Sequence, residues 1–105
     1  MRKFLALAAL IAALFTIPAM AATTRTTTLK DDLFTRSKLT IRKGTTVKWR
    51  WSTKDKHTVT ELNGKWGSKG EKKKATFKHK FAKKGKFTVY CLVHPVEMRQ
   101  RITVK

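Results

Sequence analysis

Apolar and polar side chains alternate along most of the chain beyond residue 22, which is the period of strands with one buried face. The clearest case is residues 47–51, where Val and Trp occupy one parity and Lys and Arg the other. We expect strands at residues 24–29, 39–41, 47–51, 58–62, 77–81, 87–91 and 102–104. No segment after residue 21 sustains the 3.6-residue apolar period of a helix. The pattern therefore predicts an all-β sandwich.

Turn residues separate these runs. Lys43-Gly44 and Asn63-Gly64 are turn dipeptides, and a Lys- and Gly-rich loop is expected over residues 65–74. Lys83-Lys84-Gly85 predicts a hairpin turn between the runs 77–81 and 87–91. We expect one small Greek-key β-sandwich, because the chain is too short for a second domain.

The first 21 residues have the pattern of a signal peptide. Arg2 and Lys3 precede an apolar run over residues 4–17, and Ala19-Met20-Ala21 supplies the small residues of a cleavage site. The apolar run is shorter than the roughly 20 residues of a membrane span. We therefore predict a signal peptide at 1–21, a domain at 22–105 without a transmembrane anchor, and a periplasmic or secreted protein.

The chain is strongly basic. It has 25 Lys and Arg against 6 Asp and Glu, a net charge of +19, and residues 1–21 contribute only two of these basic side chains. A field of this size favours a partner with an acidic docking surface. Diffuse lysine on alternate strand positions is equally typical of a solvated face. No recognised nucleic-acid motif is present, so we do not expect a nucleic-acid partner.

Candidate metal ligands gather near the C-terminus. Cys91, His94 and Met98 lie within eight residues, and His57 lies upstream beside a strand-like run. A lone Cys in an exported chain is a reactive thiol, an intermolecular crosslink or a metal ligand, and His94 three residues on favours the ligand. Two imidazoles, one thiolate and a weak thioether are the donors of a blue-copper electron-transfer site.

The residues around these donors resemble the cupredoxin family, in particular its plastocyanin, amicyanin and pseudoazurin branch. Residues 77–91 are similar to the family's aromatic strand, glycine turn and strand into the Cys ligand. Trp49-Arg50-Trp51 followed by His57 is similar to its strand and first His ligand. Met98 with the run 102–104 resembles the final strand. The sequence departs from the family in having three residues between His94 and Met98, and Gln100 at a frequent Gly position.

This resemblance implies a cupredoxin-like fold and one type 1 copper ion. It implies His57, Cys91 and His94 as equatorial ligands and Met98 as the axial ligand, with a backbone carbonyl or side-chain amide as the alternative to Met98. Thr58 is expected to hydrogen-bond across to the ligand loop. An apolar docking patch is expected around the second His ligand, from His94, Pro95, Val93 and Trp66.

The function implied is that of a monomeric one-electron carrier between redox partners, and not an enzyme. One alternative is a copper-binding or copper-delivery protein without redox turnover. Another is a basic polyanion-binding module on the same scaffold. We interpret His79 as an aromatic-strand residue and not as a ligand, because its parity matches Phe77 and Phe81.

Overall fold

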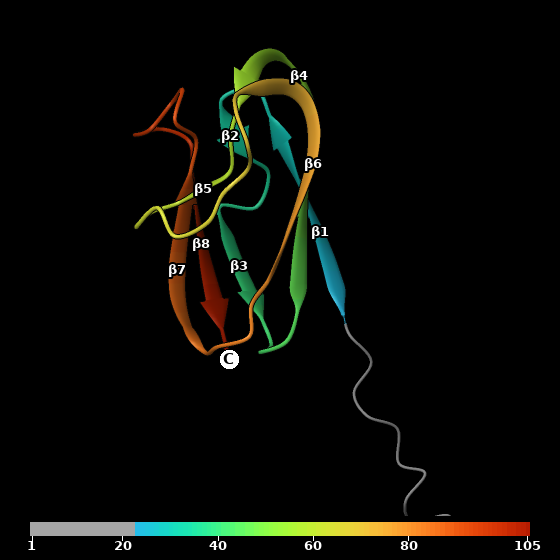
Figure 1. Cartoon of the computed structure of the whole chain (residues 1–105), viewed down its shortest axis with the longest axis vertical. Coiled ribbons are helices and arrows are strands. Elements are labelled where there is room, and N and C mark those ends of the chain that lie inside the picture. Colours follow the sequence, from blue (N-terminus) through green and yellow to red (C-terminus); the bar gives the residue numbers. More distant parts are fainter. Residues whose placement is uncertain (1–22) are drawn as a thin grey trace, which may run out of the picture.

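The computed structural model of the protein describes residues 23–105. Its strands are β1 Thr24–Lys30, β2 Leu33–Phe34, β3 Lys38–Ile41, β4 Thr46–His57, β5 Thr60–Glu61, β6 Lys72–Lys80, β7 Gly85–Tyr90 and β8 Arg99–Val104. Sheet A has the order β2-β1-β4-β6, and sheet B has the order β3-β8-β7-β5 (Figure 1). The predicted all-β sandwich is therefore confirmed. The predicted signal peptide, residues 1–21, lies outside the described residues.

Both sheets contain parallel and antiparallel pairs. The pairs β1–β4 and β3–β8 are parallel, whereas β4–β6 and β7–β8 are antiparallel. Over residues 23–105 no helix is long and apolar enough to cross a membrane.

The core lies between the two sheets and is built from the predicted inner parities. Val47, Trp49 and Trp51 of β4 are all buried, and Ile102 and Val104 of β8 face them from sheet B. The neighbouring polar residues on each strand remain at the surface, as expected for half-buried strands. Burial of one face of each sheet therefore decides the register of both.

Gln100 is a buried polar residue that connects the two sheets. Its Oε1 accepts the indole N–H of Trp49 at 2.8 Å. Its Nε2 donates to the carbonyl oxygen of Arg36 at 2.7 Å and to the Thr27 hydroxyl at 3.4 Å. The side chain is fully buried, so these three contacts replace the water that it would otherwise bind. The residue at the family's glycine position is thus a cross-sheet link.

The predicted strand 58–62 was largely wrong. Strand β4 continues to His57, which ends this strand of sheet A and does not open the next one. Only Thr60 and Glu61 form the following strand β5, and they pair with β7 of sheet B. The reason is that β4 stays paired with β6 up to His57 opposite Lys72, and the chain crosses between sheets only afterwards.

The predicted hairpin at Lys83-Lys84-Gly85 was also wrong. Strands β6 and β7 belong to different sheets, so this segment crosses from sheet A to sheet B. The crossing begins at Phe81, whose N–H donates to the Thr45 carbonyl and whose ring is buried in the core.

The short strand β2 was not predicted, since two residues are too few to show a period.

Candidate metal centre

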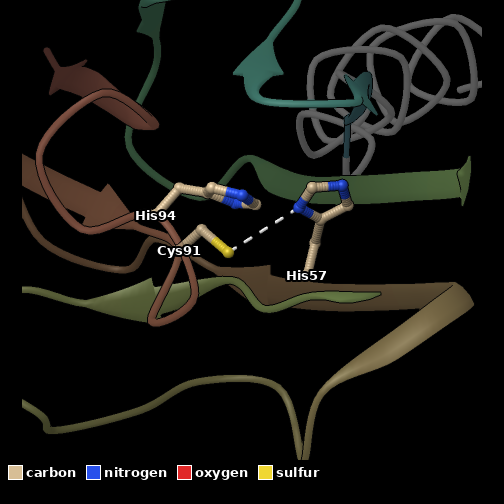
Figure 2. Close-up of side chains that lie close together, drawn as sticks. All are labelled: His57, Cys91 and His94. Atoms are coloured by element: carbon tan, nitrogen blue, oxygen red, sulfur yellow. Dashed lines mark hydrogen bonds between the residues drawn. The ribbon is translucent and has the colours of Figure 1, made fainter. Parts of the chain in front are cut away.

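Three side chains that can bind a metal converge at one end of the sandwich. One ligand atom each from His57, Cys91 and His94 lies within 4.8 Å of the other two. Figure 2 shows the Cys91 sulfur and both imidazole rings turned toward a common point. His57 ends β4, whereas Cys91 and His94 lie on the loop between β7 and β8. In Figure 1 this loop lies at the opposite end of the sandwich from the connection between β6 and β7.

The loop between β7 and β8, residues 91–98 and here called the ligand loop, holds Cys91 and His94 by backbone hydrogen bonds. The Cys91 N–H donates to the Met98 carbonyl at 3.1 Å, and the His94 N–H donates to the Cys91 carbonyl at 3.2 Å. The Met98 N–H donates in turn to the His94 carbonyl at 3.1 Å. The three residues between His94 and Met98 therefore fit within one closed turn. Cys91 itself is a free, fully buried cysteine.

An irregularity in β4 sets the position of His57. The pairing of Ser52 with Lys74 is followed by that of His57 with Lys72, so β4 uses five steps where β6 uses two. Such a bulge bends a strand and changes the direction of its side chains. The His57 ring is fully buried, with its Nδ1 at 3.8 Å from the Cys91 sulfur.

Thr58 connects the end of β4 to the ligand loop. Its hydroxyl accepts the N–H of Leu92 at 2.9 Å, which confirms the predicted bond across to this loop. Its backbone N–H donates to the Cys91 sulfur at 3.4 Å. An N–H group directed at a ligating sulfur tunes the electronic properties of a metal–thiolate bond.

One nitrogen of the cluster is buried without a hydrogen-bond partner. Among the described residues, His94 Nδ1 is the only buried side-chain nitrogen or oxygen without a hydrogen-bond partner. Buried polar atoms nearly always have a hydrogen-bond partner. The unpaired His94 nitrogen therefore indicates that it binds a group from outside the protein chain. Because it belongs to the same cluster as the Cys91 sulfur and His57 Nδ1, a metal ion would satisfy all three atoms at once.

Two adjacent aspartates hold the outer nitrogens of both histidines. Asp31 and Asp32 form the turn between β1 and β2. The Nε2 of His57 lies 3.2 Å from Asp31 Oδ1, and the Nε2 of His94 lies 3.0 Å from Asp32 Oδ1. Sequence reasoning missed both residues. The available signal was an acidic pair at a turn in a chain with only six acidic residues.

The Asp31 carboxylate is fixed from a second direction. The backbone N–H of Asp55 donates to its Oδ1 at 3.0 Å, and that of Lys54 donates to its Oδ2 at 3.1 Å. These amides, that of Asp55 first, lower the pKa of Asp31 below its ordinary value. Asp31 is therefore a carboxylate at neutral pH, and it ties the β1–β2 turn to the irregular part of β4.

Met98 is fully buried beside the ligand loop. Its backbone is bonded to both Cys91 and His94, which holds the residue next to the cluster. Thioether sulfur is the usual weak axial donor of blue-copper sites. The axial role of Met98 stays a prediction.

His79 lies in an aromatic cluster away from the three converging donors. It stacks on Trp66 with ring centroids 3.8 Å apart and an interplanar angle of 10°. Burial lowers its pKa. It pairs with Val47 near the start of β4, whereas His57 ends that strand. Trp66 is therefore not part of the docking patch predicted around His94, because it packs over this cluster instead.

Several solved structures share this fold. A purple cupredoxin from Nitrosopumilus maritimus superposes with a TM-score of 0.66 at 23% sequence identity, over 76% of this chain and 98% of that protein. An oxidized point mutant of amicyanin superposes with a TM-score of 0.65 at 22% identity, over 86% and 88% of the two chains. A Cu(I) form of another amicyanin mutant gives 0.63 at 21% identity, over 78% and 82%. The sequence matches no protein-family model and no curated protein.

The protein therefore has the cupredoxin fold, as the sequence predicted. Its cluster of His57, Cys91 and His94, with Met98 on the same loop, fits a type 1 copper site.

Proposed function

We propose that this protein binds one copper ion through His57, Cys91, His94 and Met98 and acts as an exported one-electron carrier, and not as an enzyme. The observation that carries the proposal is the convergence of two imidazole nitrogens and one thiol sulfur within 4.8 Å. A bound copper ion would supply a Cu(II)/Cu(I) couple. The protein's own contribution is a rigid frame of two sheets, which limits rearrangement between the two oxidation states.

The surroundings of His94 support electron transfer through this ligand. Its side chain is 26% exposed, whereas Cys91 and His57 are fully buried. The same loop carries exposed apolar side chains close to it in sequence, with Leu92 at 53% and Val96 at 76% exposure. A partly exposed ligand within an apolar surface allows a partner to approach the metal closely while the remaining ligands stay dry.

The charge of the protein supports a redox partner with an acidic docking surface. Arg99 donates from its Nε to the Pro95 carbonyl at 2.8 Å, so a guanidinium lies directly beside the exposed loop. A net charge of +19 over the whole chain would steer an acidic partner toward it. We infer a weak, fast and salt-sensitive complex formed by a monomer. We further propose that residues 1–21 direct export to the periplasm or beyond.

Copper binding is the direct test of this function. We expect the purified protein of residues 22–105 to take up one equivalent of Cu(II) and to develop an intense blue band with narrow copper hyperfine splitting. Ascorbate should bleach the band and reoxidation should restore it. Visible absorption and electron paramagnetic resonance spectra measure both properties. A pale, weakly bound copper together with a freely alkylated Cys91 would contradict the proposal.

Replacement of Met98 by Leu tests the axial ligand. We expect the Met98→Leu variant to keep its copper and to raise the reduction potential by about 59 mV or more, which is tenfold in the preference for Cu(I). The reason is that loss of a weak thioether donor removes more stabilisation from Cu(II) than from Cu(I). Voltammetry measures the shift.

The control for this variant is Val96→Leu, because Val96 is 76% exposed on the same loop and should leave the potential unchanged. Loss of all copper from Met98→Leu would show that Met98 has a structural role that we have misjudged. An unchanged potential would favour a carbonyl or amide oxygen as the axial donor.

A second candidate function is polyanion binding. A surface groove of about 740 Å³ lies over strands β1, β4 and β6, and its lining includes Lys30, Arg50 and Lys74. Within residues 23–105, Asp31 is the only acidic residue that lines this groove. Such a groove suits an anionic polymer, and binding there is compatible with electron transfer. Polyanion binding that is unchanged without copper would favour this class.

Copper delivery without redox turnover is disfavoured by the burial of Cys91, His57 and Met98.

A further inference from the structure

We infer that the turn Asp31-Asp32 is a positioning device for the copper site, in which each carboxylate holds one histidine ligand by its Nε2. This inference rests on the proposed function and adds to it two residues that determine the affinity and the reduction potential of the site. It starts from one geometric fact. Both imidazoles of the cluster meet a carboxylate of the same two-residue turn, at 3.2 Å and 3.0 Å.

The two contacts fix the direction of both rings. A carboxylate accepts a hydrogen bond and cannot donate one, so Nε2 of His57, which is hydrogen-bonded to Asp31, is the nitrogen that bears hydrogen. The carboxylate of Asp32, 3.0 Å from Nε2 of His94, favours hydrogen on the same nitrogen of that ring. In a neutral ring the other nitrogen, Nδ1, then carries the free lone pair. That nitrogen is 3.8 Å from the Cys91 sulfur in His57, and it is the buried unpaired atom in His94. The aspartates therefore select the tautomer that can bind a metal at the point where the three donors converge.

The two carboxylates are held with different firmness. Asp31 is anchored by the backbone N–H groups of Lys54 and Asp55, and its histidine is fully buried. Asp32 is 63% exposed and contacts the partly exposed His94. Because its carboxylate is also held by two backbone amides of β4, Asp31 belongs to the fixed frame, although its side chain is 40% exposed.

The backbone of the turn supports this role. Asp32 has a φ of 66°, the only positive φ of a non-glycine residue in the described chain. Such a left-handed conformation costs free energy for most residues, although Asp and Asn tolerate it better than others. Strained positions of this kind are concentrated at functional sites. Here the conformation lets two consecutive side chains reach two different rings.

The chemical consequence concerns the basicity of the ligands. A carboxylate that accepts the Nε2 hydrogen makes the imidazole a stronger donor and orients it, and removal of such a partner typically costs about 10–100-fold in metal affinity. The extra negative charge favours Cu(II) over Cu(I). We therefore expect the turn to strengthen copper binding and to lower the reduction potential. It does so in a protein whose other charges are mostly positive.

The experiment uses four variants of the full domain. Asp31→Asn and Asp32→Asn remove one negative charge each with little change in shape. Asp32→Gly removes the whole side chain, and glycine adopts a positive φ without strain. The control is Asp55→Asn, which has the same change of charge nearby. Among the described residues the side chain of Asp55 forms no hydrogen bond or ion pair.

For Asp31→Asn and Asp32→Asn we expect a Cu(II) affinity that is lower by about tenfold or more. The loss for Cu(I) should be smaller, so the reduction potential should rise by about 59 mV for each tenfold change in preference. Asp32→Gly should have the largest effect on the electron paramagnetic resonance spectrum, since His94 loses its anchor. Shifts no larger than those of Asp55→Asn would overturn the inference.

A second measurement is independent of copper. In the copper-free wild type, ring nitrogen-15 chemical shifts at a fixed pH where both rings are neutral should show the hydrogen on Nε2 of His57 and His94. The Asp32→Gly variant should give a mixture of tautomers for His94 alone. An unchanged tautomer would overturn the inference for Asp32. A wild-type protein that forms no blue site would contradict the proposed function. The nitrogen-15 shifts of the copper-free protein would still decide whether the turn sets the tautomers.

Discussion

Replacement of Cys91 by Ser is expected to abolish the intense blue absorption of the copper-loaded protein and to lower its copper affinity by more than about 100-fold. In the proposed site the Cys91 thiolate would be both the metal ligand and the source of soft-donor character, and a serine hydroxyl would replace neither. Loss of an outer hydrogen-bond partner alone already costs about 10–100-fold in affinity, and loss of the ligand should cost more. Copper titration followed by visible and electron paramagnetic resonance spectra measures both effects.

The fold should survive this change, because serine is close to cysteine in size and the Thr58 N–H that meets the sulfur at 3.4 Å can donate to an oxygen instead. Circular dichroism of the copper-free variant checks that it does. His79→Gln is the matched control, since it removes a histidine that stacks on Trp66 outside the cluster. It should remain blue. A blue band that persists in Cys91→Ser would refute the assignment of the site.

Replacement of Gln100 by Leu is expected to lower the free energy of unfolding by about 3 kcal/mol. The variant leaves the fully buried Trp49 indole N–H without its partner, which costs about 1–3 kcal/mol, and it also removes the part-buried bond to the Arg36 carbonyl. For a domain of this size, the midpoint of thermal unfolding should fall by roughly 12–24 °C. Denaturant and thermal unfolding of the copper-free protein measure the change.

Two comparisons make this second prediction specific. Thr103→Val changes a polar side chain on the same strand that forms no side-chain hydrogen bond within the described residues, and it should alter the free energy of unfolding by less than about 0.5 kcal/mol. In the double variant Trp49→Phe with Gln100→Leu, the loss should be smaller than the sum of the two single losses, because the unpaired donor is gone. Equal stability of Gln100→Leu and the wild type would show that the cross-sheet link is not needed.

The hydrogen bond between Gln100 and Trp49 connects strands on either side of the candidate metal centre. Gln100 lies on β8, one residue after Arg99 begins the strand that follows the ligand loop. Its bond to Trp49 connects this strand to β4, the strand that ends in His57. The link therefore connects the strand that follows the loop of Cys91 and His94 to the strand that ends in His57.

The sequence alone was sufficient for the parts of the molecule that depend on neighbouring residues. Strand alternation predicted β3, the first half of β4, β7 and β8, because the side-chain period of a strand appears directly in a run of residues, and a Thr-rich composition predicted β1. The spacing of Cys91, His94 and Met98 also indicated a shared loop. Backbone hydrogen bonds among Cys91, His94 and Met98, none spanning more than seven residues, close that loop, so its shape is largely a local property.

Only the tertiary structure decided which distant residues meet. His57 reaches Cys91 through an irregular pairing of β4 with β6, and no period in the sequence marks such a bulge. The turn Asp31-Asp32 reaches both histidines because β1 lies parallel to β4, and the crossing between β6 and β7 has the residues of an ordinary hairpin. Local periodicity determines which face of a strand is buried, whereas the pairing of strands is a balance over the whole core, and that balance brought the carboxylates to the imidazoles.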